Sequence, residues 1–96
     1  MKPSQILAER RSEILAIASK YRVRNLRIFG SVLHGEDTET SDIDLLVDAL
    51  PGATLFDLGG FQEELEEQLA VKVDVRTPVD LSKYFRDKVL AEAQPL

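Results

Sequence analysis

The sequence predicts an α/β fold in which a small mixed sheet of three or four strands is packed by helices on one side. Two observations lead to this fold class. Segment 54–69 repeats its apolar residues every three or four positions, as an amphipathic helix does. Segment 71–76 alternates strictly between apolar and charged residues, as a half-buried strand does. Because the chain has 96 residues and no second block of elements, we expect one domain over residues 1–96.

The first helix is expected over residues 4–21. Apolar residues recur at helical spacing from Ile6 to Tyr21, and charged residues fill most positions between them. Ser4 follows Pro3 and is the expected N-cap, because its hydroxyl can accept a hydrogen bond from the first helical turn.

Three segments carry strand signals. In chain order they are residues 23–29, 42–47 and 71–76. The polar segment 35–41 contains no large apolar residue and is expected to be a loop between the first two strands. Pro78 ends the third strand, because proline has no N–H to donate to a neighbouring strand.

Two further helices follow from the apolar pattern. The helix over 54–69 places its apolar residues on one stripe, which we interpret as core: Leu55, Leu58, Phe61, Leu65 and Leu69. The last helix is expected over 80–93, with its own apolar face: Leu81, Tyr84, Phe85, Val89 and Leu90. This face and the ending Gln94-Pro95-Leu96 are candidates for packing on a second copy of the chain or on a partner protein.

Composition and charge limit the cellular location and the kinds of partner that we expect. The chain contains no cysteine, no signal-peptide pattern and no apolar run of membrane-spanning length, which favours a cytoplasmic protein without membrane contact. The N-terminal third is basic, but the middle, from Glu36 to Asp74, is strongly acidic, and the net charge is −5. Direct nucleic-acid binding is therefore not expected, because it depends on a favourable interaction with the phosphate backbone. A chain this short also favours a partner, either another protein or a second copy.

The candidate site begins with Gly30-Ser31, which is followed by ten residues and then Asp42-Ile43-Asp44. A glycine-containing turn lets backbone N–H groups approach a phosphate closely. Asp42 and Asp44 are two positions apart, so in a strand both side chains point to the same face, roughly 6.6 Å apart along the backbone. A phosphate cradle beside paired carboxylates is typical of phosphoryl or nucleotidyl transfer with two metal ions.

Asp74 is the third candidate carboxylate. It lies in the middle of the expected strand 71–76, on the face opposite Val73 and Val75. If this strand lies beside the strand of Asp42 and Asp44, the three carboxylates can hold Mg²⁺, which prefers oxygen ligands. Asp74 can alternatively accept the proton of an attacking hydroxyl. Each signal alone is more often an ordinary turn or surface acid, and the prediction depends on their order and strand context.

These residues resemble a known family. The stretch FGSVLHGEDTETSDIDLLV, together with Asp74, is similar to the minimal nucleotidyltransferases, or MNT proteins, of the DNA polymerase β-type nucleotidyltransferase superfamily. The resemblance implies the polymerase β-like nucleotidyltransferase core as the fold. It also implies that Gly30 and Ser31 bind the triphosphate, that Asp42 and Asp44 carry the metal ions, and that Asp74 is the third acid.

The resemblance implies a reaction and a partner as well. MNT proteins transfer a nucleoside monophosphate from a nucleoside triphosphate, usually AMP from ATP, in a reaction that requires Mg²⁺, with two ions expected. They commonly pair with HEPN-domain ribonuclease toxins and act as antitoxins by adenylylating a tyrosine of the toxin. The resemblance therefore predicts a protein adenylyltransferase antitoxin.

One position departs from the family pattern. Relatives usually read Gly-Ser-x-x-Arg-Gly, and here His34 stands in the arginine position. Histidine is shorter than arginine and near neutral at pH 7, so His34 is either a phosphate-binding residue or a plain loop residue. The alternative function is accordingly a binding antitoxin that neutralises its partner by forming a stoichiometric complex, without catalysis.

Overall fold

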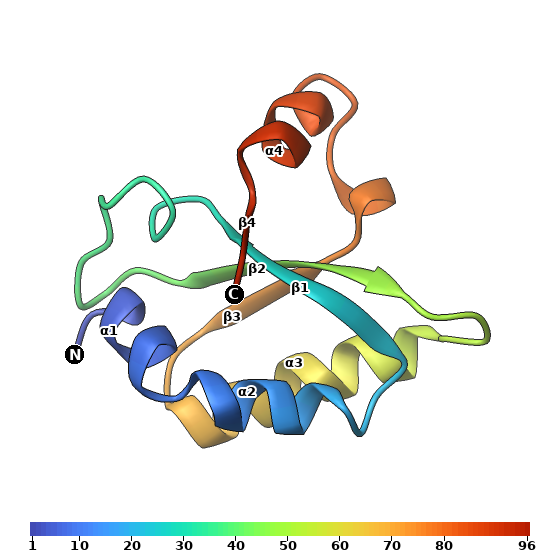
Figure 1. The fold of residues 1–96 in the computed structure, drawn as a ribbon, viewed down its shortest axis with the longest axis horizontal. Helices are drawn as coiled ribbons and strands as arrows, with labels where there is room; N and C mark the ends of the chain where they lie inside the picture. The colour runs from blue at the N-terminus through green and yellow to red at the C-terminus, as the bar shows by residue number, and fades with distance from the viewer.

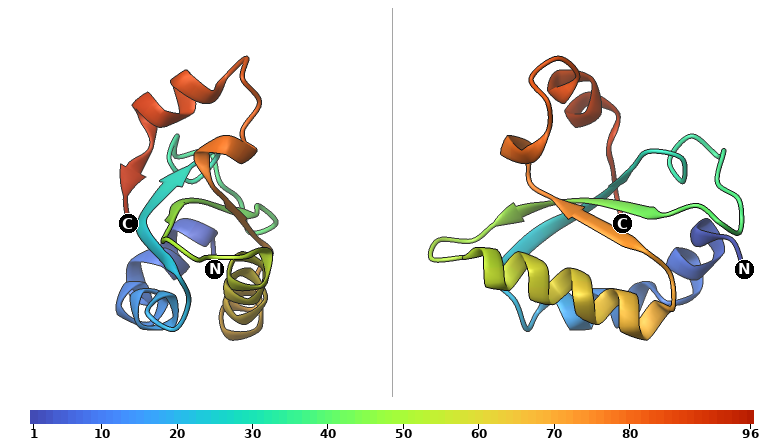
Figure 2. Two further views of the ribbon diagram at one scale, coloured as in Figure 1. Left: turned by 90° about the vertical axis from the view of Figure 1, so that its right-hand side faces the viewer. Right: turned by 180° about the vertical axis from the view of Figure 1, so that it is seen from behind.

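The computed structural model describes residues 1–96 as a four-stranded sheet with three helices on one face and a fourth on the other (Figure 1). In chain order the elements are α1 (Pro3–Glu9), α2 (Arg11–Ala18), β1 (Val23–Phe29), β2 (Ile43–Ala49), α3 (Leu55–Leu69), β3 (Val73–Arg76), the 3₁₀ turn η1 (Pro78–Asp80), α4 (Arg86–Glu92) and β4 (Gln94–Pro95). Figure 2 shows α2 and α3 side by side beneath the sheet, with α4 on the opposite side. The predicted α/β class is confirmed. None of the helices has the length and apolar character needed to span a bilayer.

The sheet is mixed, with the strand order β3-β2-β1-β4. Strands β1 and β2 run antiparallel and β2 and β3 run parallel, while β4 pairs antiparallel with β1. A bulge interrupts β1 where Asn25 adopts a positive φ of 55°. On β2, alternate residues face opposite sides of the sheet, so the helices cover one set and leave Asp42 and Asp44 on the other.

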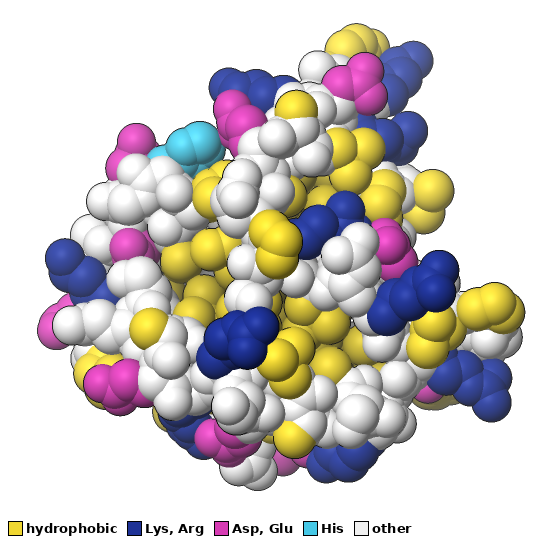
Figure 3. All heavy atoms as spheres, viewed as in Figure 1, with side chains coloured by type: hydrophobic (Ala, Val, Ile, Leu, Met, Phe, Trp, Pro, Cys, Tyr) yellow, Lys and Arg dark blue, Asp and Glu magenta, His cyan; other side chains and the backbone are white.

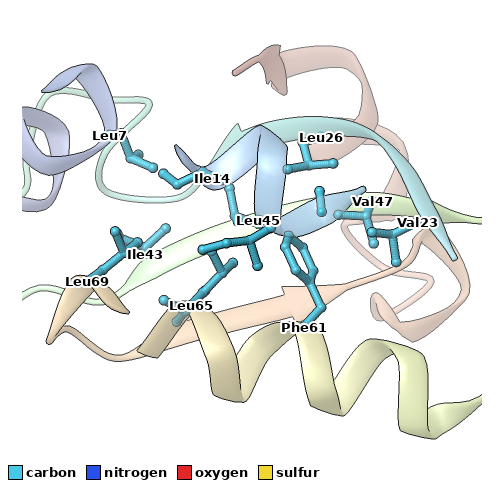
Figure 4. Close-up of a cluster of buried hydrophobic side chains, with 13 residues drawn as sticks. Leu7, Ile14, Val23, Leu26, Ile43, Leu45, Val47, Phe61, Leu65 and Leu69 are labelled. Atoms are coloured by element: carbon cyan, nitrogen blue, oxygen red, sulfur yellow. The ribbon is translucent and has the colours of Figure 1, made fainter. Parts of the chain in front are cut away.

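The core lies between the sheet and the helices α1, α2 and α3 (Figure 4). Ile43, Leu45 and Val47 of β2 are fully buried there against Phe61 and Leu65 of α3. Thr54 caps α3, because its hydroxyl accepts a hydrogen bond from the N–H of Phe56 at 3.2 Å. The predicted helix over 54–69 and its buried stripe are confirmed except at the first turn, where Leu55 is 85% exposed.

The predicted single helix over 4–21 is wrong, because the chain forms two helices that meet at Arg10. Its backbone leaves the helical region there, with φ −113° and ψ 21°. The Arg10 side chain bonds both Glu13 oxygens and the backbone oxygen of Gln68, which holds the junction against α3. Ser4 is not the N-cap, since α1 begins at Pro3 after Lys2.

The C-terminal region also differs from the prediction. The helix expected over 80–93 is limited to α4, and Tyr84 of its expected apolar face is 87% exposed. The residues that precede α4 form η1 and an irregular turn instead. Gln94 and Pro95, for which no strand was predicted, form β4 along the edge of β1.

Both edges of the sheet are covered or blunted. At the β3 edge, the N–H groups of Val73 and Val75 donate to the side chains of Glu66 (3.1 Å) and Gln62 (2.9 Å) of α3. At the other edge, β4 contains only two residues, and Pro95 has no N–H to offer. The sheet therefore presents few free backbone groups at either side.

Candidate functional site

The strand register brings two of the predicted carboxylates side by side. Asp44 of β2 and Asp74 of β3 are direct partners in the parallel pairing, and neighbouring strands lie roughly 4.8 Å apart. Asp42 immediately precedes β2 and shares the strand alternation of Asp44. The three carboxylates therefore belong to the face of the sheet that α1, α2 and α3 leave open.

Asp44 is the electrostatic centre of this group. Burial raises the pKa of the half-buried Asp44 carboxyl, and the negative charge of Asp74 raises it further. The positive charge of Arg76 opposes this rise, while Asp42 adds to it. A divalent cation would relieve the same repulsion, so the charge pattern and the all-oxygen ligand set fit Mg²⁺.

The carboxylates of Asp44 and Asp74 accept no hydrogen bond and make no ion pair, so their oxygens are available to a ligand. Asp42 has one weak contact, with Lys72 Nζ 3.9 Å from its Oδ2. No three Asp, Glu or His side chains lie close enough together to hold a metal ion by themselves. Mg²⁺ commonly completes its coordination with substrate phosphates and water, which this open arrangement permits.

The Gly30 turn lies directly against Asp44. Gly30 ends β1 with a φ of +76°, and Phe29 pairs with Asp44 across the two strands. A Cβ atom at residue 30 would lie 2.4 Å from Asp44 Oδ2, well inside contact distance. The absence of a side chain at Gly30 therefore allows the carboxylate to occupy its place.

The segment after Gly30 forms hydrogen-bonded turns and no regular helix. The N–H of His34 donates to the Gly30 oxygen (3.2 Å), and the N–H of Glu36 donates to the Ser31 oxygen (2.9 Å). Gly30 thus borders the carboxylate of Asp44, and Ser31 follows it in the turn. Their assignment as phosphate-binding residues stays a prediction.

His34 makes its contact away from the carboxylates. Its Nε2 lies 3.3 Å from Glu92 Oε2 of α4, and both side chains are partly exposed, His34 at 48%. The structure therefore ties the turn to α4 through this pair. Whether His34 is a phosphate-binding residue or a plain loop residue stays a prediction.

Sequence reasoning missed one residue on this face, Arg76. It follows Asp74 by two positions in β3, and its charge acts on Asp44. The strict alternation of segment 71–76 already placed residues 74 and 76 on the same face, and that signal could have identified it.

The surface has three pockets, and all of them lie away from the carboxylates. Two of them flank Pro95 and Leu96, where the C-terminal segment crosses β1, and Figure 3 shows apolar side chains gathered in this part of the surface. A third is lined by acidic residues of α3 and by Tyr21. The carboxylates line none of the three, which is consistent with a site open to a large partner.

Known proteins resemble this chain in sequence. The family model of the nucleotidyltransferase domain matches residues 11–96. A candidate protein adenylyltransferase of Methanocaldococcus jannaschii is 41% identical over 85 residues, which cover 88% of this chain and 91% of the relative. The protein adenylyltransferase MntA of Thermococcus cleftensis is 33% identical over 76 residues, covering 79% of this chain and 78% of MntA.

Solved structures share the fold. One that is described as a candidate minimal nucleotidyltransferase has a TM-score of 0.84 and 39% identity, and the match covers 97% of this chain and 95% of that one. A toxin-antitoxin structure with AMP-PNP has a TM-score of 0.72 at 20% identity, covering 88% and 69%. An MntA-HpeT toxin-antitoxin structure has a TM-score of 0.70 at 22% identity, covering 90% and 70%. At these identities the two complexes establish similarity of fold.

Proposed function

This chain belongs to the nucleotidyltransferase domain family, and we propose that it transfers AMP from ATP to a hydroxyl group of a partner protein. The observation that carries the proposal is the register pairing of Asp44 with Asp74 beside Gly30. These residues place two carboxylates and a turn without a side chain at one point on the sheet face opposite α2 and α3. A nucleotide and a protein acceptor can both reach such a face.

The carboxylates of Asp42, Asp44 and Asp74 are the proposed ligands of Mg²⁺, with two ions expected. When bound, Mg²⁺ neutralises charge on the phosphates and polarises the phosphorus that is attacked. The chain's own contribution is to hold the oxygens together in a half-buried place, where burial first and then the charge of Asp74 raise the pKa of Asp44. The backbone N–H groups of the turn at Gly30 and Ser31 are proposed to bind the triphosphate, with His34 as a secondary candidate.

In the proposed reaction, the acceptor hydroxyl oxygen attacks the α-phosphorus of ATP. An oxygen–phosphorus bond forms to the acceptor, and the bond to pyrophosphate breaks. Asp74 is placed on the outer strand β3, on the far side of Asp44 from the Gly30 turn, and is the proposed acceptor of the hydroxyl proton. The Gly30 turn then borders the carboxylates on the β1 side, and the acceptor hydroxyl meets them beside Asp74.

The proposed acceptor is a tyrosine of a HEPN-domain ribonuclease toxin, for which this chain would act as antitoxin. The similarity to MntA of Thermococcus cleftensis, which is named a protein adenylyltransferase, supports the class of reaction. The fold shared with MntA in the MntA-HpeT structure supports a toxin as partner. The open carboxylate face supports a protein acceptor, because no deep pocket restricts the site to a small molecule.

The alternative is a binding antitoxin that neutralises the toxin by complex formation alone. The observation that favours it is the His34–Glu92 pair. His34 stands where relatives have an arginine, and its contact with Glu92 leaves it less available to bind phosphate. The retained carboxylates favour catalysis.

Intact-mass spectrometry of the HEPN partner tests the proposal. The partner is incubated with this protein, Mg²⁺ and each nucleoside triphosphate in turn, and the Asp42→Asn/Asp44→Asn protein is the control. We expect the partner to gain one or more nucleoside monophosphates, with ATP as donor, and to gain none with the control. A stable complex without any mass gain would contradict catalysis and support the binding antitoxin.

A further inference from the structure

Arg76 presents an unpaired positive charge on the carboxylate face. It ends β3, and it pairs in register with Leu46 as Asp74 pairs with Asp44. Residues two apart in a strand point to the same face, so Arg76 emerges roughly 6.6 Å along the strand from Asp74. Its side chain is exposed and makes no hydrogen bond or ion pair.

Four other cationic side chains near this face have a partner within the chain. Arg27 donates to Asp48 Oδ1 at 2.7 Å, and Arg86 donates to the backbone oxygen of Leu81 at 2.9 Å. Lys72 lies 3.9 Å from Asp42. His34, in the turn, contacts Glu92. Arg76 differs from these four side chains because it makes no hydrogen bond or ion pair, so its positive charge is available to a ligand.

Without a metal ion, Arg76 compensates part of the repulsion among the carboxylates. A divalent cation bound by those carboxylates would perform the same task and would repel the guanidinium. The metal ion and the guanidinium of Arg76 can then lie close together only if an anion binds between them. The phosphate chain of a nucleotide is such an anion, and a guanidinium can bind phosphate oxygens through two parallel hydrogen bonds.

We propose that Arg76 binds the phosphate chain of the nucleoside triphosphate and supplies the fixed positive charge that the turn from Gly30 to Gly35 lacks. This inference rests on the proposed function, because it assigns a ligand to the same site. It gives β3 two roles, since Asp74 faces the acceptor hydroxyl while Arg76 holds the donor.

Calorimetric titration with an ATP analogue tests the inference on the isolated protein in the presence of Mg²⁺. The analogue carries a methylene group between the α- and β-phosphorus, so no transfer can occur. The variants are Arg76→Gln and Arg76→Lys, with Arg24→Gln as the matched control. Arg24 is also an exposed strand arginine, but it lines the hollow beside Leu15 and Pro95, away from the carboxylates.

We expect Arg76→Gln to weaken binding of the analogue about tenfold, as loss of a charge-assisted contact of about 1.4 kcal/mol does. Arg76→Lys should lose less, about threefold, because it keeps the charge but not the planar geometry. Arg24→Gln should stay within about twofold of the wild type. Titration with Mn²⁺ alone should give equal or tighter binding for Arg76→Gln, because a repelling charge has been removed.

The opposite sign of these two effects makes the result decisive. Arg76→Gln protein that binds the analogue as tightly as wild type, while wild type binds it well, overturns the inference and leaves the proposed function intact. Wild-type protein that fails to bind any nucleotide contradicts both. Weaker binding of Mn²⁺ alone by Arg76→Gln would indicate a distorted site and would also overturn the inference. Because Arg76 is exposed, loss of its compensating charge should lower the melting temperature of Arg76→Gln only slightly, and Arg76→Lys should melt like the wild type.

Discussion

Gly30 satisfies two requirements, one from its own backbone and one from Asp44. Its φ of +76° lies in the left-handed region, which costs other residues about 1–2 kcal/mol. A Cβ would also collide with the Asp44 carboxylate, which is the end of a side chain and can turn away. A side chain at residue 30 therefore affects stability through the backbone and affects the site through Asp44.

Gly35 allows these two effects to be separated. It has a similar φ of +69°, but a Cβ there would meet no atom within 4 Å. We expect Gly30→Ala and Gly35→Ala each to lower the free energy of unfolding by about 1–2 kcal/mol, measured by urea denaturation. Only Gly30→Ala should also reduce transfer to the partner, by up to about 100-fold, because the carboxylate is displaced. Equal activity of the two variants would show that the Asp44 position does not depend on Gly30.

At the scale of single residues, spacing predicted which side chains share the site but not all their contacts. Asp42, Asp44 and Asp74 follow from strand alternation, because a period of two fixes the face without any knowledge of the neighbours. The His34–Glu92 contact joins a turn to the helix α4, 58 residues apart, so no local pattern contains it. Whether the carboxylates carry metal ions stays a prediction.

At the scale of elements, α1 is fastened to the loop that leads into β2. The N–H of Ser4 donates to Asp37 Oδ2 at 2.9 Å, although Asp37 belongs to the polar segment that was expected to be an ordinary loop. Asp37 is buried, and this hydrogen bond lowers the pKa of its carboxyl. The contact holds both α1 and the chain that delivers Asp42.

We expect Asp37→Ala to lower the melting temperature at pH 7. A lowered pKa means that the carboxylate stabilises the fold above its unfolded-state pKa, and that this contribution is lost as pH falls through the folded-state pKa. The difference from wild type should therefore shrink as the pH falls toward 3. Glu39→Ala is the matched control, because Glu39 is an exposed acid of the same loop. A deficit that stayed constant from pH 7 to pH 3 would contradict a role for the charge.

The elements themselves were predictable where one pattern is long and regular. The helix α3 and the strands β1, β2 and β3 were predicted with small errors at their ends. The break at Arg10 was not, because it depends on a contact with the backbone of Gln68, which is distant in sequence. The strand β4 was not predicted either, since two residues that include Pro95 carry no strand signal.

At the scale of the whole molecule, the charged carboxylate of Asp44 lowers the free energy of unfolding. Asp44 and Asp48 lie on the same strand, and the structure acts on them in opposite ways. Burial and like charges raise the pKa of Asp44. Hydrogen bonding from Asn25 and the positive charge of Arg27 lower the pKa of Asp48. One carboxylate opposes folding when charged, and the other favours it.

Thermal melting without divalent cations should reveal this contrast. We expect Asp44→Asn to melt above wild type at pH 7, because a raised pKa makes the charged carboxyl unfavourable, and this gain should fade as pH falls through that pKa. Asp48→Asn should melt below wild type at pH 7, with a loss that fades as pH falls through the lowered pKa of Asp48. Two variants that shift in the same direction would contradict the electrostatic interpretation.

The covered edges of the sheet have a consequence for how this molecule meets others. An exposed strand edge is a template on which further chains can assemble, and it is a common origin of aggregation. Here Glu66 and Gln62 occupy the backbone donors of β3, and Pro95 blunts β4. We therefore expect a partner to be recognised through side chains. Copies of the chain made in excess of that partner have no free strand edge on which to assemble.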